Sequence, residues 1–212
     1  MIDAYVWTTP NGFKALIALE ELGLPYRAHW VDISKGEQLE PAYLAINPNH
    51  KIPAIVDHDG PGGTPVTVFE SGAVLTYLAE KTGRFLAKDG ADRYAQLAWV
   101  FFNIGNTGPM LGQLGFFAKF APEKIPLAID RYTKEAERLF GVLDRQLAQA
   151  PYLAGAAYSI ADMINVTWPR GARDFLGLDL SAYPNLTRWI AEIEARPAVA
   201  RALAMKPDAK PA

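Results

Sequence analysis

Over about the first 80 residues, hydrophobic and polar positions predict alternating strands and helices. Residues 2–7 form a run of β-branched and aromatic side chains, as expected of a short strand. Residues 13–22 place apolar side chains on one face of a helix, and Gly23 follows as its C-cap. The same patterns continue with strands over 26–31, 52–57 and 66–69 and with helices over 39–45 and 70–81.

The turn signals between these segments set the order of the elements. Asp59-Gly60-Pro61-Gly62-Gly63 separates the last two strands and predicts a hairpin between them. The expected order is therefore βαβαββα, an α/β domain over residues 1–83.

From about residue 90 the strand signals stop and helical spacing takes over. The Gly/Pro-rich stretch 105–115 is expected to kink or interrupt its helix. Ser159-Ile160-Ala161-Asp162 resembles a capping box with Asp in place of Glu. These patterns predict an all-helical domain over 90–205, followed by a frayed tail over 206–212. Its expected helices cover 93–102, 122–150, 159–175, 183–196 and 197–204.

Composition narrows the class of protein. Half of the 212 residues are hydrophobic and 21% are charged, so the chain can bury a sizeable core. The 21 Lys and Arg against 23 Asp and Glu give a net charge of -2, which does not favour nucleic acid as a partner. Cysteine is absent, which excludes disulfide scaffolds, thiolate metal sites and a cysteine nucleophile in the protein.

Further patterns bear on location and metals. The first residues have neither the cationic start nor the long apolar run of a signal peptide. The most apolar stretch, 97–120, is interrupted by polar residues and glycines, so no membrane span is expected and the cytoplasm is the default location. His29, His50 and His58 lack metal-ligand spacing, and no metal site is expected.

Two motifs carry a resemblance to a known family. Asn49-His50-Lys51-Ile52-Pro53-Ala54 precedes the third strand, and Phe69-Glu70-Ser71-Gly72-Ala73 opens the helix after the fourth. With this element order, the whole chain resembles a glutathione transferase. The resemblance implies a thioredoxin-like N-terminal domain, an all-helical C-terminal domain and a two-fold homodimer.

Five shorter segments narrow this resemblance. Together they are similar to the bacterial Nu-class enzymes, which are glutathione-dependent disulfide-bond reductases related to the fungal prion-forming nitrogen regulator. The segments are Thr9-Pro10-Asn11-Gly12, Lys35-Gly36-Glu37-Gln38, residues 47–58, Leu111-Gly112-Gln113 and Ile129-Asp130-Arg131-Tyr132.

The turn Thr9-Pro10-Asn11-Gly12 has two compatible interpretations. In the first, it is a capped turn in which Asn11 serves as N-cap of the helix. In the second, implied by the resemblance, the helix N-terminus, the Thr9 hydroxyl and the Asn11 amide favour a glutathione thiolate. Trp7 stands where many family members have a tyrosine that donates to sulfur, while Tyr5 is expected to pack in the sheet.

Lys51-Ile52-Pro53 is either a trans proline opening an edge strand or a binding turn. The resemblance implies a cis Ile52–Pro53 bond whose exposed backbone pairs with the cysteinyl residue of glutathione. Lys51 and Gln38 would then bind the glycyl carboxylate or backbone, although Lys51 alone reads as a surface lysine.

Glu70 and Ser71 could have a structural role alone, in which the acid complements the helix dipole and the serine satisfies an unpaired N–H of the first turn. The resemblance implies instead that Glu70 binds the ammonium of the γ-glutamyl residue and that Ser71 binds its α-carboxylate. Arg131 either pairs with Glu135, four residues on, or binds a glutathione carboxylate.

The stretch 103–120 is expected to be a kinked core helix or the wall of an apolar pocket for a second substrate. Its candidates for such a wall are Pro109, Met110, Phe116, Phe117 and Phe120.

The resemblance and the absent cysteine together predict a glutathione-dependent disulfide-bond oxidoreductase. Glutathione would be the co-substrate, as one or two molecules or as its disulfide, and would supply every thiol. A small disulfide or electrophile would be the other partner. Glutathione transfer or peroxide reduction at the same site, and a non-catalytic interaction module of the same fold, remain as alternatives.

Overall fold

The computed structural model describes residues 1–207. The described chain divides into two compact units, one of Met1–Arg84 together with residues 196–207, and one of Phe85–Ala195. Of the tail predicted over 206–212, residues 206 and 207 are described and are not helical, while 208–212 lie outside the described residues.

The first unit contains a four-stranded mixed sheet in the order β2-β1-β3-β4. β1 and β2 are parallel, whereas β1 with β3 and β3 with β4 are antiparallel. The expected hairpin between β3 and β4 is present and turns through a short 3-10 helix, Pro61–Gly63. The strands are β1 Ile2–Val6, β2 Tyr26–Trp30, β3 Ala54–Asp57 and β4 Val66–Phe69.

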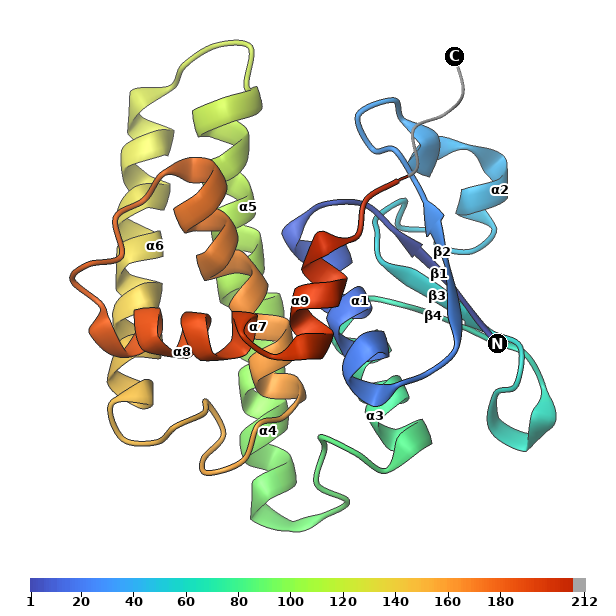
Figure 1. Cartoon of the computed structure of the whole chain (residues 1–212). Coiled ribbons are helices and arrows are strands. Elements are labelled where there is room, and N and C mark those ends of the chain that lie inside the picture. Colours follow the sequence, from blue (N-terminus) through green and yellow to red (C-terminus); the bar gives the residue numbers. More distant parts are fainter. Residues whose placement is uncertain (208–212) are drawn as a thin grey trace. The chain divides into compact units, whose positions relative to one another are not determined.

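Helices cover both faces of this sheet (Figure 1). On one face, α1 (Pro10–Leu22) contacts β1, α3 (Ser71–Thr82) contacts β3 and β4, and the two helices pack against each other. On the other face, Tyr5 packs edge to face against Tyr43 of α2 (Pro41–Leu44). Successive side chains of a strand point to opposite faces of the sheet. Along β1, Ala4 and Val6 are fully buried on one face, and the half-buried Tyr5 points to the other. The βαβαββα order is confirmed.

The last helix, α9 (Pro197–Ala204), packs on α1 within the first unit. Arg196 donates to both carboxylate oxygens of Glu21 at 2.5 and 3.0 Å, and Arg201 donates to Glu20 at 2.7 Å. The division of the chain at residue 195 therefore differs from the predicted domain limits, 1–83 and 90–205. The amphipathic pattern of this helix gives no indication of which domain it covers.

The second unit is helical throughout its regular structure. The predicted interruption near 105–115 takes the form of two π-helical segments, Asn103–Thr107 and Phe116–Phe120, on either side of α5. A third π-helical segment, Ala172–Leu176, extends α7. The α-helices are α4 Gly90–Phe102, α5 Gly108–Gly115, α6 Pro126–Leu147, α7 Ile160–Gly171 and α8 Pro184–Glu194.

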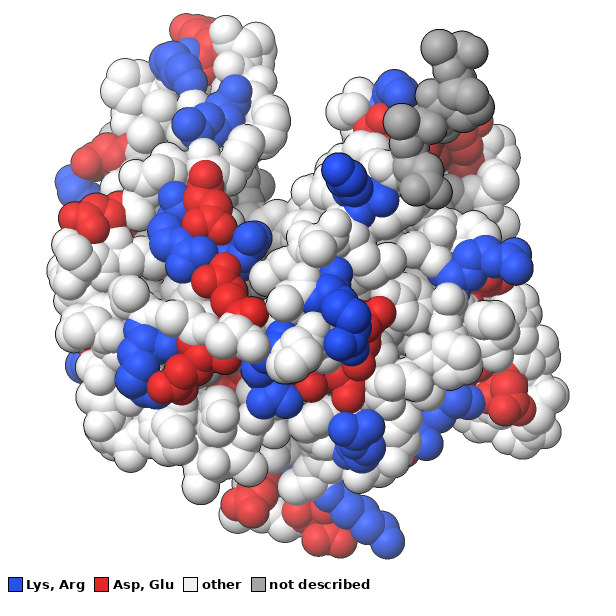
Figure 2. Space-filling model, viewed as in Figure 1, with Lys and Arg blue, Asp and Glu red and all other residues white. Residues whose placement is uncertain are grey.

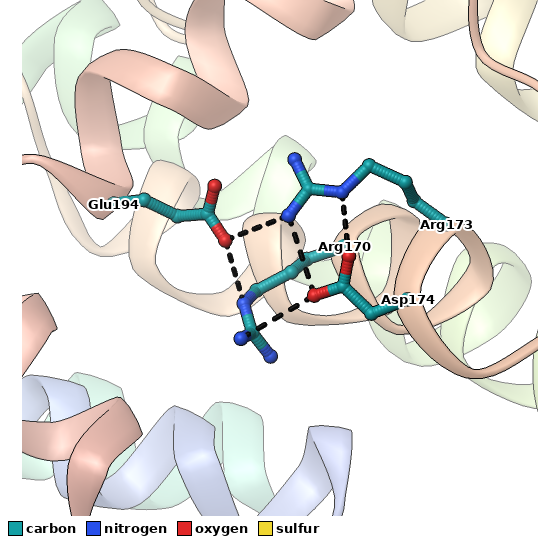
Figure 3. Close-up of polar contacts among 4 residues, drawn as sticks. All are labelled: Arg170, Arg173, Asp174 and Glu194. Carbon is teal, nitrogen blue, oxygen red and sulfur yellow. Dashed lines mark hydrogen bonds and ion pairs between the residues drawn. The ribbon is translucent and has the colours of Figure 1, made fainter.

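Two polar clusters hold α7 and α8 together. The predicted capping box is confirmed, and Asp162 also accepts bonds from the Leu153 N–H and the Trp189 indole, each at 3.0 Å. Figure 3 shows the second cluster, in which Arg170 and Arg173 both donate to one oxygen of Glu194, at 2.7 and 2.9 Å. Asp174 pairs with the same two arginines, so each charge has two partners.

Basic and acidic side chains are interspersed over the face of the molecule shown in Figure 2. Among residues 1–207, no helix combines the length and the apolar character needed to cross a membrane.

Candidate active site

A pocket of about 130 Å³ in the first unit brings together residues from three separate segments. It joins the first turn of α1, the loop before β3 and the first turn of α3. Six residues expected from the sequence line it, and Asn47 lines it in addition. The expected ones are Asn11, Lys51, Ile52, Pro53, Glu70 and Ser71.

Thr9, and not Asn11, is the N-cap of α1, so the interpretation of Asn11 as N-cap is wrong. The Thr9 Oγ1 accepts a bond from the Gly12 N–H at 3.3 Å, Pro10 takes the first helical position, and Asn11 follows within the first turn. Proline favours that first position because its missing N–H and fixed φ suit a helix start. A hydroxyl whose oxygen accepts still has its own hydrogen to donate, so Thr9 can cap the helix and donate to a ligand.

Gly12 allows α1 to begin against the end of β1. A Cβ at this position would lie 2.0 Å from the Trp7 carbonyl oxygen, so only glycine fits without a backbone shift. Trp7 itself packs with Tyr43 and Ile52 in a small apolar cluster. Tyr5 packs in the sheet as expected, with its ring stacked on His29 at 4.8 Å between centroids.

Asn47 and Tyr43 hold the loop that precedes β3. Both donate to the Lys51 carbonyl, the Asn47 amide at 2.7 Å and the Tyr43 hydroxyl at 2.6 Å. Burial raises the pKa of Tyr43 to about 12, so its hydroxyl remains a donor. The Asn47 side chain is 1% exposed and also accepts from the Asn49 N–H at 2.9 Å.

The Ile52–Pro53 bond is cis, which confirms the expectation. Ile52 is buried, with 8% of its surface exposed. Within residues 1–207, its backbone N–H and C=O nevertheless make no hydrogen bond. A buried backbone N–H is expected to have a partner, so these groups are suited to pair with a bound peptide.

Glu70 and Ser71 form the third side of the pocket. Glu70 occupies the N-cap position of α3 with a φ of 69°, a conformation that costs a residue with a side chain about 1–3 kcal/mol. Its carboxylate is exposed and accepts from the Asn49 side chain at 3.4 Å. Ser71 is the first residue of α3, where the N–H groups of a helix start can bind a carboxylate.

Lys14 approaches Ser71 from α1 and was not expected from the sequence. Its side chain is 1% exposed, and its Nζ donates to the Ser71 Oγ at 3.4 Å. Burial lowers the pKa of Lys14 to about 7, and the charge of Glu70 opposes this shift. The sequence offered one signal of its burial, because Lys14 is the one lysine inside an otherwise apolar stretch of helix, residues 13–19.

Three expected residues do not line the pocket. Thr9 lies two residues before Asn11, and Gln38 lies on the 3-10 helix Glu37–Leu39 with a buried Oε1 that has no hydrogen-bond partner among residues 1–207. Arg131 is an exposed residue of α6 in the second unit. Glu135 accepts two bonds from Arg138, at 2.7 and 2.9 Å, and the charge of the expected partner Arg131 adds to the lowering of the pKa of Glu135 without a direct ion pair.

The histidines do not assemble a metal site in the part of the chain that is described. His29 and His58 each contact one oxygen of Asp3, at 2.8 and 2.7 Å. Residues 1–207 contain no group of three or more side chains suited to hold a metal ion.

Comparison with protein-family models decides the family. The model of the glutathione S-transferase N-terminal domain matches residues 8–81, and the model of the C-terminal domain matches residues 108–197. This chain belongs to the glutathione transferase family. The disulfide-bond oxidoreductase YfcG of Escherichia coli is 48% identical to it, over 96% of this chain and 94% of the relative.

Solved glutathione transferases have the same fold. The enzyme of Burkholderia graminis, with two glutathione molecules bound per subunit, is 44% identical with a TM-score of 0.92, covering 98% of this chain and 89% of that one. The enzyme of Pseudomonas putida, with one glutathione disulfide per subunit, is 43% identical with a TM-score of 0.90, covering 97% and 92%. In this family the N-terminal domain is thioredoxin-like and the C-terminal domain is helical, and these domains correspond to the first and the second unit.

Proposed function

We propose that this glutathione transferase is a glutathione-dependent disulfide-bond oxidoreductase. The observation that carries the proposal is the pocket itself, which joins a helix N-terminus, a cis-proline turn and a second helix N-terminus in a chain without cysteine. The name of the E. coli relative and the glutathione disulfide bound by the P. putida enzyme support it.

The pocket accounts for each part of glutathione in turn. Glu70 takes the γ-glutamyl ammonium, and Ser71 with the first N–H groups of α3 takes the α-carboxylate. The backbone of Ile52, beside Pro53, pairs with the cysteinyl residue. Lys51 binds the glycyl end. Gln38 and Arg131 do not line the pocket, and we propose that Gln38 also binds the glycyl end and that Arg131 binds a carboxylate of a bound glutathione.

This placement directs sulfur toward the start of α1. The Thr9 hydroxyl and the Asn11 amide donate to it, and the partial positive charge of the helix N-terminus favours the thiolate. A free thiol of this kind has a pKa of about 8.5, so these donors increase the ionised fraction at neutral pH. The side chains act through orientation and charge, and none of them has to accept a proton.

The reaction then needs two thiols, and glutathione supplies both. The first thiolate attacks one sulfur of the substrate disulfide, which breaks its S–S bond and releases one substrate thiol after protonation. The second glutathione thiolate attacks the glutathione sulfur of the mixed disulfide. Glutathione disulfide and the second substrate thiol are the products, so two glutathiones are oxidised for each disulfide reduced.

An aromatic surface on the second unit favours transfer to an apolar electrophile as a second candidate. Phe116 and Phe120 are 47% and 67% exposed, and Phe120 stacks on Phe175 at 5.8 Å. Phe117 stacks on Tyr132, also at 5.8 Å. Such a surface fits a wall for an apolar substrate better than a helix core, and Pro109 and Met110 precede it in α5.

We assign the chain to the Nu class, expect it in the cytoplasm, and propose a homodimer without a nucleic acid, membrane or metal partner. The exposed Tyr94 and Phe101 of α4, at 73% and 68%, are apolar surface that a second copy would cover. Sedimentation at micromolar concentration tests the dimer.

The experiment that tests the function compares reactions side by side. Purified protein is assayed with glutathione and a small dialkyl disulfide, an aryl chloride or an alkyl hydroperoxide. We expect the disulfide to have the highest kcat/KM. A higher kcat/KM for the aryl chloride would favour transfer, and no turnover and no glutathione-induced rise in Tm would favour an interaction module.

A further inference from the structure

Lys14 is a buried amine that the proposed chemistry does not use. It lies in the first half of α1 with its side chain 1% exposed, although a lysine on a surface helix normally extends its amine into water. Its Nζ donates to the Oγ of Ser71, which lines the pocket from the first turn of α3. The amine therefore lies behind the wall of the pocket and contacts that wall through Ser71.

We infer that Lys14 is the positioning residue of the carboxylate subsite at the start of α3, and that it gains a proton when a carboxylate binds there. The inference rests on the proposed function, because it takes the ligand to be the γ-glutamyl end of glutathione. Since the Ser71 oxygen accepts from Lys14, the hydroxyl hydrogen is left to donate toward the pocket. Lys14 thus orients the hydroxyl and adds positive charge behind it.

The charge that acts on Lys14 comes from a residue that lines the pocket. Glu70, at the N-cap of α3, is the acidic group whose charge acts on it. The other charged groups on α1 and on the elements packed against it have partners of their own. Asp3 of β1 contacts His29 and His58, Glu20 and Glu21 pair with Arg201 and Arg196, Lys81 of α3 pairs with Asp57, and Glu80 lies near the far end of α3.

Binding and protonation are therefore linked. In the free protein, burial holds the pKa of Lys14 at about 7, so near neutral pH the amine is only partly charged. A bound carboxylate favours the ammonium form and raises this pKa. Between about pH 7 and the raised pKa of the bound state the protein must then take up a proton on binding, and affinity falls as the pH rises across this range.

Calorimetry with S-methylglutathione, which has no thiol to titrate, measures this uptake. The titration is run at pH 8 in two buffers with different ionisation enthalpies, on the wild type, on Lys14→Met and on Lys88→Met. Lys88 is an exposed residue of the second unit and serves as the control. We expect Lys88→Met to match the wild type, and Lys14→Met to take up fewer protons and to bind at least fivefold more weakly.

The outcomes separate this inference from the proposed function. Equal proton uptake in wild type and Lys14→Met overturns the role of Lys14 and leaves the glutathione site standing, whereas no binding by the wild type overturns the site.

If Lys14→Met does not fold, carbon-13 NMR of lysine side chains in the wild type replaces it. The titration midpoint of the buried amine should rise by at least one pH unit when S-methylglutathione is added. An ordinary lysine midpoint, or one that the ligand does not move, contradicts the inference.

Discussion

At the scale of single residues, three neutral polar side chains stand at the helix starts in and beside the pocket. Thr9 caps α1, Asn11 lies in its first turn, and Ser71 begins α3, so each polar group also has a local structural reason to be there. This overlap explains why sequence alone leaves two interpretations of each motif open. It also means that a variant must separate capping from binding.

Replacing Thr9 with Ala should lower the rate of disulfide reduction without abolishing it. Asn11 and the backbone N–H groups remain at the proposed position of the sulfur. The loss of transition-state stabilisation should therefore be smaller than the ~2.7–4 kcal/mol that removing one essential donor costs. Losing the cap should also cost about 0.5–2 kcal/mol of stability. Thr9→Ser keeps both functions and should restore rate and Tm. A rate as low for Thr9→Ser as for Thr9→Ala would argue against the hydroxyl.

Glu70 should matter for binding much more than for folding. Its carboxylate is exposed and makes no capping bond, so Glu70→Ala removes the ammonium partner and leaves α3 intact. We expect glutathione to bind more weakly by about 1.5–3 kcal/mol, as for a charge-assisted hydrogen bond. Calorimetry against Glu123→Ala, an exposed carboxylate of the second unit, provides the control. An unchanged Kd would remove Glu70 from the site.

At the scale of elements, two close fits position the pocket. The first is the entry of α1 beside the Trp7 carbonyl, which Gly12 permits. The second is the end of β3, where Asp57 accepts from Tyr77 at 2.6 Å and pairs with Lys81 at 3.0 Å, both on α3. These contacts fix α1 and α3 on the sheet, and the first turns of both helices line the site.

Gly12→Ala should damage both the fold and the site. The new Cβ would meet the Trp7 carbonyl oxygen at 2.0 Å, so the start of α1 must move, at a cost of about 1–3 kcal/mol. We expect a lower Tm and a higher KM for glutathione. Gly105→Ala is the matched control, because a Cβ there meets nothing within 4 Å. Equal effects of the two substitutions would contradict the close fit.

Asp57 should stabilise the first unit above its pKa. Burial alone would raise the pKa of Asp57, but the bonds from Tyr77 and the Asp59 N–H and the charge of Lys81 outweigh it, so the pKa is lowered. A lowered carboxyl pKa contributes stability above the unfolded value, about 3.9, and this contribution is lost as the pH falls through the folded value.

Asp57→Asn should therefore cost about 1–3 kcal/mol at pH 7. The difference from the wild type should hold between pH 5 and 8 and shrink below about pH 4, measured by urea unfolding. A difference that grows toward low pH would contradict this assignment.

At the scale of the whole molecule, much of the fold could be predicted from the sequence. Alternating and helical periodicities indicated the four strands and the main helices, and the Ser159–Asp162 capping box was visible as a motif. Local signals did not reveal that α9 packs on α1, because an amphipathic helix does not encode its partner.

The site was predictable where motifs are contiguous, as in the lining by Ile52, Pro53, Glu70 and Ser71. Lys14 and Asn47 act through contacts that only folding creates, with Ser71 and the Lys51 carbonyl. The placement of all of these residues against glutathione stays a prediction, as does that of Gln38 and Arg131, which do not line the pocket.

The central claim is that glutathione supplies every reacting thiol, because the chain has no cysteine. The most direct test is the rate of reduction of a small disulfide by protein treated with an alkylating reagent, after the excess reagent is removed. With glutathione, we expect the full rate and one glutathione disulfide formed per disulfide reduced. With a thiol-free reductant in place of glutathione, we expect no turnover. Loss of activity after alkylation, or turnover without glutathione, would contradict the account.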